Sequence, residues 1–318
     1  MSRDKTLARD LIAALLAATM VFGAVRAVNA AENGLPNLEM PTRGGRLVWK
    51  DHYVHAGWRI QENTLTGHHR LLDPDNVRMA WGSYTECKAE FDRLRRRLSI
   101  HPASRHLVVF IHGILGSARE FIKQREAARA AGFDAVALSY PSTRRRIQDH
   151  AHGIAVVIER LEGTDTISFV TYSMGGIVLR NLMARNDPWR RTLKLGRAVM
   201  IAPPNQGAAA ARMVKSNGLY RYVFGETGQQ LVPAEVFDMP GLAAVPFAVI
   251  AGGKGDGEGF NPVLPGDDDG AVRVAETRLA GSRAHLIVPA LHQRITDNPE
   301  TVRATVNFLR HGRFGSLN

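Results

Sequence analysis

The sequence is poor in cysteine, in acidic residues and in long apolar runs. Its one cysteine, Cys87, excludes an intrachain disulfide and a metal site built from cysteines. Cys87 lies in a stretch with the pattern of a helix face, which favours a structural thiol over a nucleophile. The remaining composition, 45% hydrophobic and 22% charged over 318 residues, is that of a globular chain long enough for a large core.

The shortage of acids leaves a formal net charge of +11. Such an excess can attract nucleic acid or anionic lipid. Arginine occurs in small clusters, such as 95–97 and 144–146, but no aromatic residues are interleaved with them and no nucleic-acid-binding motif is present. We therefore expect no nucleic-acid partner and a solvated basic surface, with association with a membrane surface left open.

The N-terminus has the pattern of a targeting segment. The uncharged run Leu11–Val25 has 15 residues, which is short for a membrane span and typical of the core of a signal peptide. Val28-Asn29-Ala30 then offers the small residues that a signal peptidase recognises. We expect residues 1–30 to be a signal peptide cleaved before Ala31, so that the protein is periplasmic or secreted. The alternative is an uncleaved anchor formed by residues 11–25, with the rest of the chain outside the cytoplasm.

The region that follows carries weak strand signals and four histidines. Residues 31–44 are rich in proline, glycine and asparagine and predict a linker. Residues 46–72 mix aromatic, β-branched and turn residues, which predicts one or two antiparallel strands at a sheet edge. On a strand, His52 and His55 point to opposite faces, and no carboxylate spacing supports a metal site with them or with the pair 68–69. We therefore expect structural histidines and no metal.

Residues 84–98 predict an amphipathic helix with Cys87, Phe91, Leu94 and Leu98 on one face.

From His106 onward the pattern is regular. Short, nearly continuous apolar segments alternate with helical ones, as in a parallel sheet covered on both faces. These segments are 107–111, 135–138, 166–170, 198–201, 247–250 and 285–288. The sequence thus predicts an α/β fold over residues 45–318, with a mostly parallel central sheet, helices on both faces and antiparallel strands at its N-terminal edge. Ligands of such sheets bind beyond the carboxyl ends of the strands.

A serine lies at one of these strand ends. The segment Thr166–Val170 predicts a strand, and Ile177–Leu179 looks like part of a helix that packs on the sheet. Ser173 lies at the turn between them, followed by Met174, Gly175 and Gly176. This is the pattern of a nucleophile elbow, G-x-S-x-G, with Thr171 in place of the first glycine. A serine nucleophile needs a base, a group that orients the base, and donors for the oxyanion.

The other parts follow other strand ends. His112 and Gly113 follow the first strand, and their loop could direct the Ile114 N–H toward the same space as the Met174 N–H, forming an oxyanion hole. The base is predicted to be His292, after the last strand, in preference to His285 and His311.

The acid is predicted in the run 267–269. Asp269 is favoured because it immediately precedes the turning Gly270, and Asp268 is the alternative. A run of three carboxylates also suggests calcium, but the full spacing of a calcium loop is missing. We expect no cofactor.

These motifs resemble a known family. The strings VVFIHGILGS, VTYSMGG, DGAV and ALHQRI look like the lipase/esterase branch of the α/β-hydrolase superfamily, over roughly residues 105–312. The resemblance implies an α/β-hydrolase fold and a triad in the order Ser173, Asp269, His292. It implies a serine hydrolase that cleaves carboxylic esters of small molecules or lipids. The alternatives are an acyltransferase with the same triad and a non-catalytic envelope protein that binds ligands on a hydrolase scaffold.

One long connection stands out within this region. Residues 208–242 contain many apolar and aromatic side chains between two predicted core strands. A connection of this composition and length predicts a cap or lid over an acyl pocket. The alternative is a helical excursion that packs against the sheet.

Overall fold

A parallel sheet organises the fold. The structure is a computed structural model that describes residues 40–42, 48–102, 104–209, 227–231, 239, 241–242 and 245–315. Within these residues the sheet has six strands in the order β11-β10-β9-β8-β6-β7, and each neighbouring pair is parallel. The strands are β6 (His106–Ile111), β7 (Asp134–Leu138), β8 (Thr166–Tyr172), β9 (Lys194–Ile201), β10 (Phe247–Gly252) and β11 (His285–Val288). All six segments predicted from the sequence form strands.

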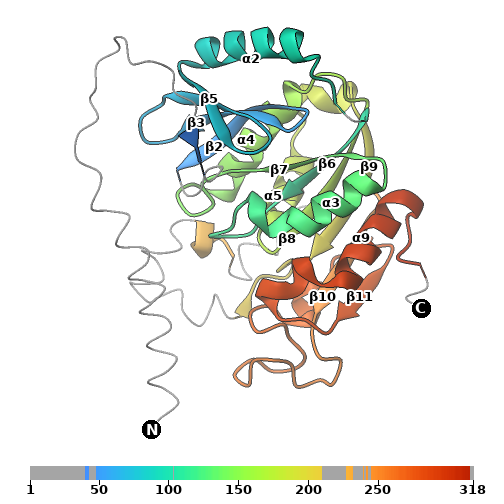
Figure 1. Cartoon of the computed structure of the whole chain (residues 1–318). Helices are drawn as coiled ribbons and strands as arrows, with labels where there is room; N and C mark the ends of the chain where they lie inside the picture. Colours follow the sequence, from blue (N-terminus) through green and yellow to red (C-terminus); the bar gives the residue numbers. More distant parts are fainter. Residues whose placement is uncertain are drawn as a thin grey trace. The chain divides into compact units, whose positions relative to one another are not determined.

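Helices cover both faces of this sheet (Figure 1). Alternate residues of β6 enter two different cores: Val108 and Phe110 pack with α3 (Ile122–Ala130) and α9 (Pro299–His311). Val109 and Ile111 pack on the other face with α4 (Ile147–Glu159) and α5 (Gly175–Ala184). Because both faces are buried, the strands must be apolar at nearly every position, which is why their sequences are continuous runs. The predicted fold class is confirmed.

Several short elements complete this layer. Helix α9 begins with a capped first turn, since the Asn298 side chain accepts hydrogen bonds from the N–H groups of Glu300 and Thr301, and Pro299 occupies the first turn. Four 3-10 helices lie among the described residues: η2 (Ala118–Phe121), η3 (Pro188–Arg191), η4 (Val274–Thr277) and η5 (His292–Asp297).

The N-terminal region forms a second, antiparallel sheet. Its strands are β1 (Met40–Pro41), β2 (Trp49–His55), β3 (Trp58–Asn63), β4 (His69–Leu72) and β5 (Val77–Gly82), in the order β1-β5-β4-β3-β2. The sequence predicted antiparallel strands here, but only one or two of them at the edge of the main sheet. The structure has a sheet with its own core, because the predicted helix α2 (Tyr84–Leu98) covers one of its faces (Figure 1).

Helix α2 shows why this sheet can have a core of its own. Ser83 and Glu86 form a capping box at its start, which satisfies backbone N–H groups of the first turn. Cys87, Phe91 and Leu94 are buried against the sheet, and burial raises the pKa of the Cys87 thiol to about 12, so it is a structural thiol as predicted. Leu98 does not join them and is 53% exposed, because it lies in the last turn of the helix.

One buried aspartate joins the two sheets. The Asp51 N–H on β2 donates to the Ser139 carbonyl, and the Asp51 carboxylate accepts from the Ser139 N–H at 2.7 Å. Ser139 directly follows β7, so β2 is fixed beside the edge strand of the parallel sheet. The antiparallel sheet therefore adjoins the carboxyl end of β7.

Three predicted segments fall wholly or mainly outside the described residues. These are the targeting segment 1–30, the linker 31–44 and most of the cap segment 208–242. All described residues belong to one unit, Leu38–Asn318, by their contacts. No helix within the described residues has both the length and the apolar character needed to cross a membrane.

Candidate active site

Ser173 lies on a tight strand-to-helix turn. Strand β8 ends at Tyr172 and α5 begins at Gly175, and Ser173 between them has a φ of 52°, in the left-handed region. Such a backbone conformation is costly for a residue other than glycine and recurs at functional sites. A Cβ at Gly175 would lie 2.1 Å from the Ile111 carbonyl oxygen, so only glycine fits there. Thr171, the departure from the elbow motif, belongs to the strand and not to the turn, and it is fully buried.

Three predicted residues lie in one chain of hydrogen bonds. The Ser173 Oγ is 3.0 Å from His292 Nε2, and His292 Nδ1 is 2.6 Å from Asp269 Oδ2. Because a carboxylate only accepts, Nδ1 must donate to Asp269, which leaves Nε2 free to accept the Ser173 hydroxyl proton. This is the tautomer that a general base requires.

The loop that carries Asp269 determines which acid meets the histidine. Asp269 Oδ1 accepts from the N–H groups of Ala271 and Val272, which directs Oδ2 toward His292. Asp268, the alternative acid, has its Oδ1 bound by the N–H groups of Asn261 and Gly270. Asp268 therefore supports the loop and makes no hydrogen bond with His292.

Two tyrosines that the sequence analysis did not single out hold this arrangement. The Tyr172 hydroxyl donates to the His292 carbonyl at 2.8 Å, and the His292 N–H donates to the Asp269 carbonyl. The Tyr140 hydroxyl donates to the His112 carbonyl at 2.5 Å, and its ring stacks on the imidazole with centroids 4.2 Å apart. The position of Tyr172, next to Ser173, was the only sequence signal for either residue.

The predicted oxyanion loop lies against the elbow. A Cβ at Gly113 would be 3.0 Å from the Ser173 Cβ, so glycine is needed for this close approach. His112 Nδ1 donates to the Gly113 carbonyl at 2.8 Å, which fixes the direction of the following peptide group. Within the described residues, neither the Ile114 N–H nor the Met174 N–H has a hydrogen-bond acceptor. These two groups are available to a substrate oxygen.

The competing histidines lie elsewhere. His285 opens β11 and its Nε2 is 2.9 Å from the Thr277 hydroxyl, while His311 ends α9. The aspartates of the 256–268 loop accept backbone N–H groups; Asp267, for example, accepts from Lys254 and Gly255. No group of acids in the described part of this loop has the spacing of metal ligands.

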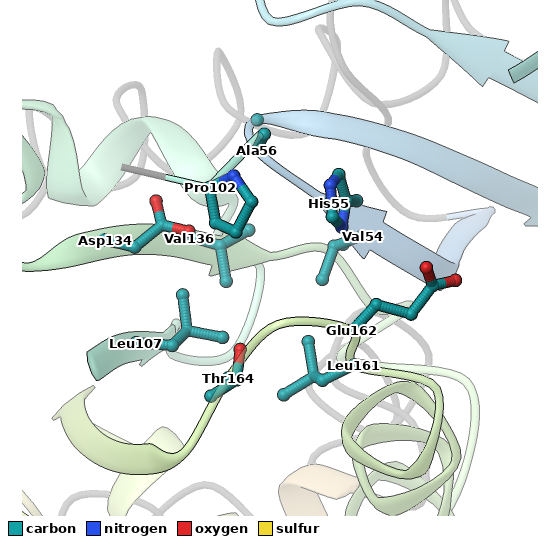
Figure 2. Close-up of a pocket in the computed structure, with 11 residues that line it drawn as sticks. Val54, His55, Ala56, Pro102, Leu107, Asp134, Val136, Leu161, Glu162 and Thr164 are labelled. Atoms are coloured by element: carbon teal, nitrogen blue, oxygen red, sulfur yellow. The ribbon is translucent and has the colours of Figure 1, made fainter. Parts of the chain in front are cut away.

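A small cavity lies at the amino ends of the parallel strands, opposite to the strand ends that carry Ser173 (Figure 2). Leu107 and Asp134, which line it, are at the amino ends of β6 and β7, and His55 and Glu162 close it from other segments. Its volume of about 20 Å³ is enough for one water molecule. This cavity is too small for an ester substrate and lies away from the strand ends that carry Ser173 and His292.

A larger cavity of about 130 Å³ lies on the carboxyl side of β7. Tyr140 and His150 line it, and His150 Nε2 is 3.3 Å from the Thr227 hydroxyl. Burial, followed by the neighbouring His112 imidazole, lowers the pKa of His150 to about 4. His150 is therefore neutral at neutral pH.

The His150 pKa predicts a loss of stability in mild acid. An unfolded histidine titrates near 6.5, so between pH 6.5 and 4 the unfolded state binds the proton more strongly than the folded state. The free energy of unfolding should fall by about 2 kcal/mol for this residue between pH 7 and 5. Urea titrations at both pH values should show a smaller fall for His150→Gln than for the wild type. An equal fall in both proteins would contradict the assignment.

The structure places a carboxylate beside two of the N-terminal histidines, which the sequence analysis did not predict. His52 Nδ1 lies 3.1 Å from His69 Nε2, and Glu62 Oε2 lies 3.7 Å and 3.9 Å from these two atoms. The sequence analysis considered carboxylate spacing along one strand, whereas these three residues come from β2, β3 and β4. Burial is the largest cause that lowers the pKa of His52, to about 4, and it also lowers the pKa of His69.

The architecture and one solved structure define the fold. The chain has the α/β-hydrolase fold, as the motifs implied. The Bacillus licheniformis lipase BlEst2 in its propeptide form is similar in structure, with a TM-score of 0.51 and 23% identity. The match covers 62% of this chain and 48% of that one, so this chain spans about half the length of the BlEst2 propeptide form.

A family model matches part of the sequence. Residues 101–195 match the family described as "Putative serine esterase (DUF676)", a segment that includes His112 and Ser173. The match supports ester hydrolysis. No curated protein matches this chain in sequence.

Two further solved structures are similar at lower scores. The mature form of BlEst2 has 22% identity and a TM-score of 0.49, and covers 59% of this chain and 85% of that chain. The metagenomic carboxyl esterase MGS0156 has 20% identity and a TM-score of 0.49. This match covers 61% of this chain and 67% of that chain.

Proposed function

We propose that this protein is a serine hydrolase that cleaves carboxylic esters, with Ser173 as the nucleophile, His292 as the general base and Asp269 as its orienting carboxylate. The observation that carries the proposal is the unbroken sequence of contacts from the Ser173 hydroxyl through His292 to Asp269, with distances of 3.0 Å and 2.6 Å. Asp269 is buried, with 1% of its surface exposed, so its charge can stabilise the imidazolium that forms during the reaction.

The first half of the reaction forms an acyl-enzyme. The Ser173 oxygen attacks the ester carbonyl while its proton passes to His292 Nε2. The carbonyl oxygen becomes an oxyanion and accepts hydrogen bonds from the Ile114 and Met174 N–H groups, each worth about 3 kcal/mol of the barrier. His292 then gives its proton to the leaving alkoxide, and an alcohol departs.

The second half releases the acid. A water molecule gives a proton to His292 Nε2 as its oxygen attacks the acyl carbonyl. The new tetrahedral intermediate collapses, Ser173 recovers the proton from His292, and a carboxylic acid leaves. The free serine is restored without any cofactor.

The substrate class follows from the same chemistry and from the esterase family match. We expect uncharged esters of small molecules or lipids to be cleaved. A series of p-nitrophenyl esters from acetate to palmitate tests this, because release of p-nitrophenol reports activity and the best chain length reports the size of the acyl pocket. Turnover of at least one ester, with saturation, is expected. Folded protein that releases p-nitrophenol from no ester in the series would contradict the proposal.

Export is part of the proposal and rests on the sequence of residues 1–30. Cleavage before Ala31 would place the enzyme in the periplasm or the medium. The intact mass of the protein recovered from these fractions should correspond to a chain that starts at Ala31. A full-length chain in the membrane fraction would support the anchor formed by residues 11–25 instead, and a full-length chain in the cytoplasm would contradict export.

A further inference from the structure

Three side chains of the antiparallel sheet converge on one point. The atoms His52 Nδ1, Glu62 Oε2 and His69 Nε2 form a triangle with sides of 3.1, 3.7 and 3.9 Å. A point equidistant from the three atoms lies about 2.1 Å from each, which is the length of a Zn–N or Zn–O bond. We propose that His52, Glu62 and His69 form a binding site for a divalent transition metal ion of the Zn²⁺ type.

Strand register places the three residues together. Glu62 on β3 pairs directly with His69 on β4, and with Lys50 on β2. A β-bulge interrupts β2 between Asp51 and Tyr53, so His52 is the extra residue of the bulge. Bulges redirect side chains, and here the bulge brings His52 beside the Glu62–His69 pair.

The surrounding groups hold the imidazoles in place. The Tyr84 ring packs edge-on against both His52 and His69, with centroids 5.4 and 5.7 Å away. The Arg160 guanidinium lies over Tyr84 and donates to the His52 carbonyl at 3.1 Å. These contacts orient the rings before any ion arrives, which reduces the entropic cost of binding.

The ligand set selects the kind of ion. Two imidazoles and one carboxylate suit Zn²⁺ and other late first-row ions, and do not suit Mg²⁺ or Ca²⁺, which prefer oxygen ligands. The side chains of His52, Glu62 and His69 are 23%, 21% and 12% exposed, so an ion can reach them and a water molecule can complete a tetrahedral shell.

Lys50 competes with the ion for the Glu62 carboxylate. Its ammonium lies 2.9 Å from the same Glu62 oxygen, in a pair whose lysine side chain is 30% exposed. A partly exposed ion pair of this kind contributes little, so the lysine can move into solvent when an ion takes the carboxylate. The ion would then link β2, β3 and β4 and stabilise a sheet that lies outside the parallel core.

The test is metal binding by the mature protein without an affinity tag, after removal of bound metal with a chelator. Calorimetry should show one Zn²⁺ per chain with a Kd of about 1 μM or below, and no binding of Mg²⁺ or Ca²⁺. At a free Zn²⁺ concentration of 100 Kd, the melting temperature should rise by about 5 °C. Neither readout depends on esterase activity.

Variants separate this site from incidental binding by surface histidines. Glu62→Gln and His69→Gln should each weaken Zn²⁺ binding by at least about 100-fold. His101→Gln, at an exposed histidine outside the site, should bind like the wild type. Lys50→Gln should bind about 3-fold more tightly, because the competing ammonium is gone. The absence of saturable binding in the wild type, or binding that survives in both site variants, would overturn the proposal.

Discussion

Replacing Ser173 by alanine should lower kcat/KM for the best ester by about 10⁵-fold, because no other hydroxyl can take its place in the acyl-enzyme. Ser173 Oγ is the atom that His292 Nε2 faces at 3.0 Å, and without it no acyl-enzyme can form. The residual rate would come from water attack on an ester held at the oxyanion donors.

A matched serine variant on β8, the strand that leads to Ser173, controls for folding. Ser168 lies in the amino half of β8, where its hydroxyl interacts with His106 and with the Arg197 N–H. Ser168→Ala should keep kcat/KM within about 3-fold of the wild type even if it lowers stability, since hydrogen bonds of this kind contribute about 1 kcal/mol. Ser173→Ala that keeps more than a few per cent of the wild-type kcat/KM would show that Ser173 is not the nucleophile.

The adjacent aspartates offer the second test with a large expected effect. Asp269→Asn should lower kcat by about 10³- to 10⁴-fold, because an amide at this position favours the wrong histidine tautomer and cannot stabilise the imidazolium. Asp268→Asn should leave kcat within about 10-fold of the wild type, because Asp268 bonds only to backbone N–H groups of Asn261 and Gly270 in its loop.

The comparison depends on measuring kcat and stability together. Asp268→Asn is expected to lower the melting temperature, since Asp268 is fully buried and its carboxylate holds the loop. Asp269→Asn is expected to affect kcat far more than KM. The opposite pattern, with Asp268→Asn inactive and Asp269→Asn active, would assign the orienting role to Asp268.

Much of the parallel layer could be predicted from the sequence because its signals are local. A strand buried on both faces must be apolar throughout, so segments such as 107–111 and 285–288 are recognisable without any knowledge of their neighbours. The elbow is also local, since Ser173, Gly175 and the turn between strand and helix are adjacent in the chain. His292 could be chosen as the base because it lies after the last strand, just as the other proposed site residues lie after the carboxyl ends of earlier strands.

What could not be predicted depends on contacts between distant segments. Asp268 and Asp269 are adjacent in the chain, and only the folded loop decides that Asp269 faces His292 while Asp268 accepts backbone N–H groups. The antiparallel sheet was underestimated because its strands mix polar and apolar residues and so lack the continuous apolar runs of the parallel strands. The cluster of His52, Glu62 and His69 depends on register across three strands and on a bulge, neither of which leaves a periodic trace in the sequence.

The arrangement of the two sheets has a consequence for the active site. Asp51 holds β2 at the carboxyl end of β7, and Tyr140, one residue beyond Ser139, holds the carbonyl of His112 in the loop after β6. The antiparallel sheet therefore supports the parallel sheet at the carboxyl ends of its strands, which is the end where Ser173 lies. An ion that stabilised β2, β3 and β4 would therefore stabilise the fold beside the active site and would not take part in the chemical step.

The most direct test of the central claim is labelling with a fluorophosphonate, which reacts preferentially with an activated serine. Intact mass spectrometry of the wild type should show one adduct per chain, and peptide mapping should place it on Ser173. Labelling should disappear in Ser173→Ala and become much slower in His292→Gln, because the hydroxyl needs its base. Folded wild-type protein that stays unlabelled, or an adduct on any other residue, would contradict the account.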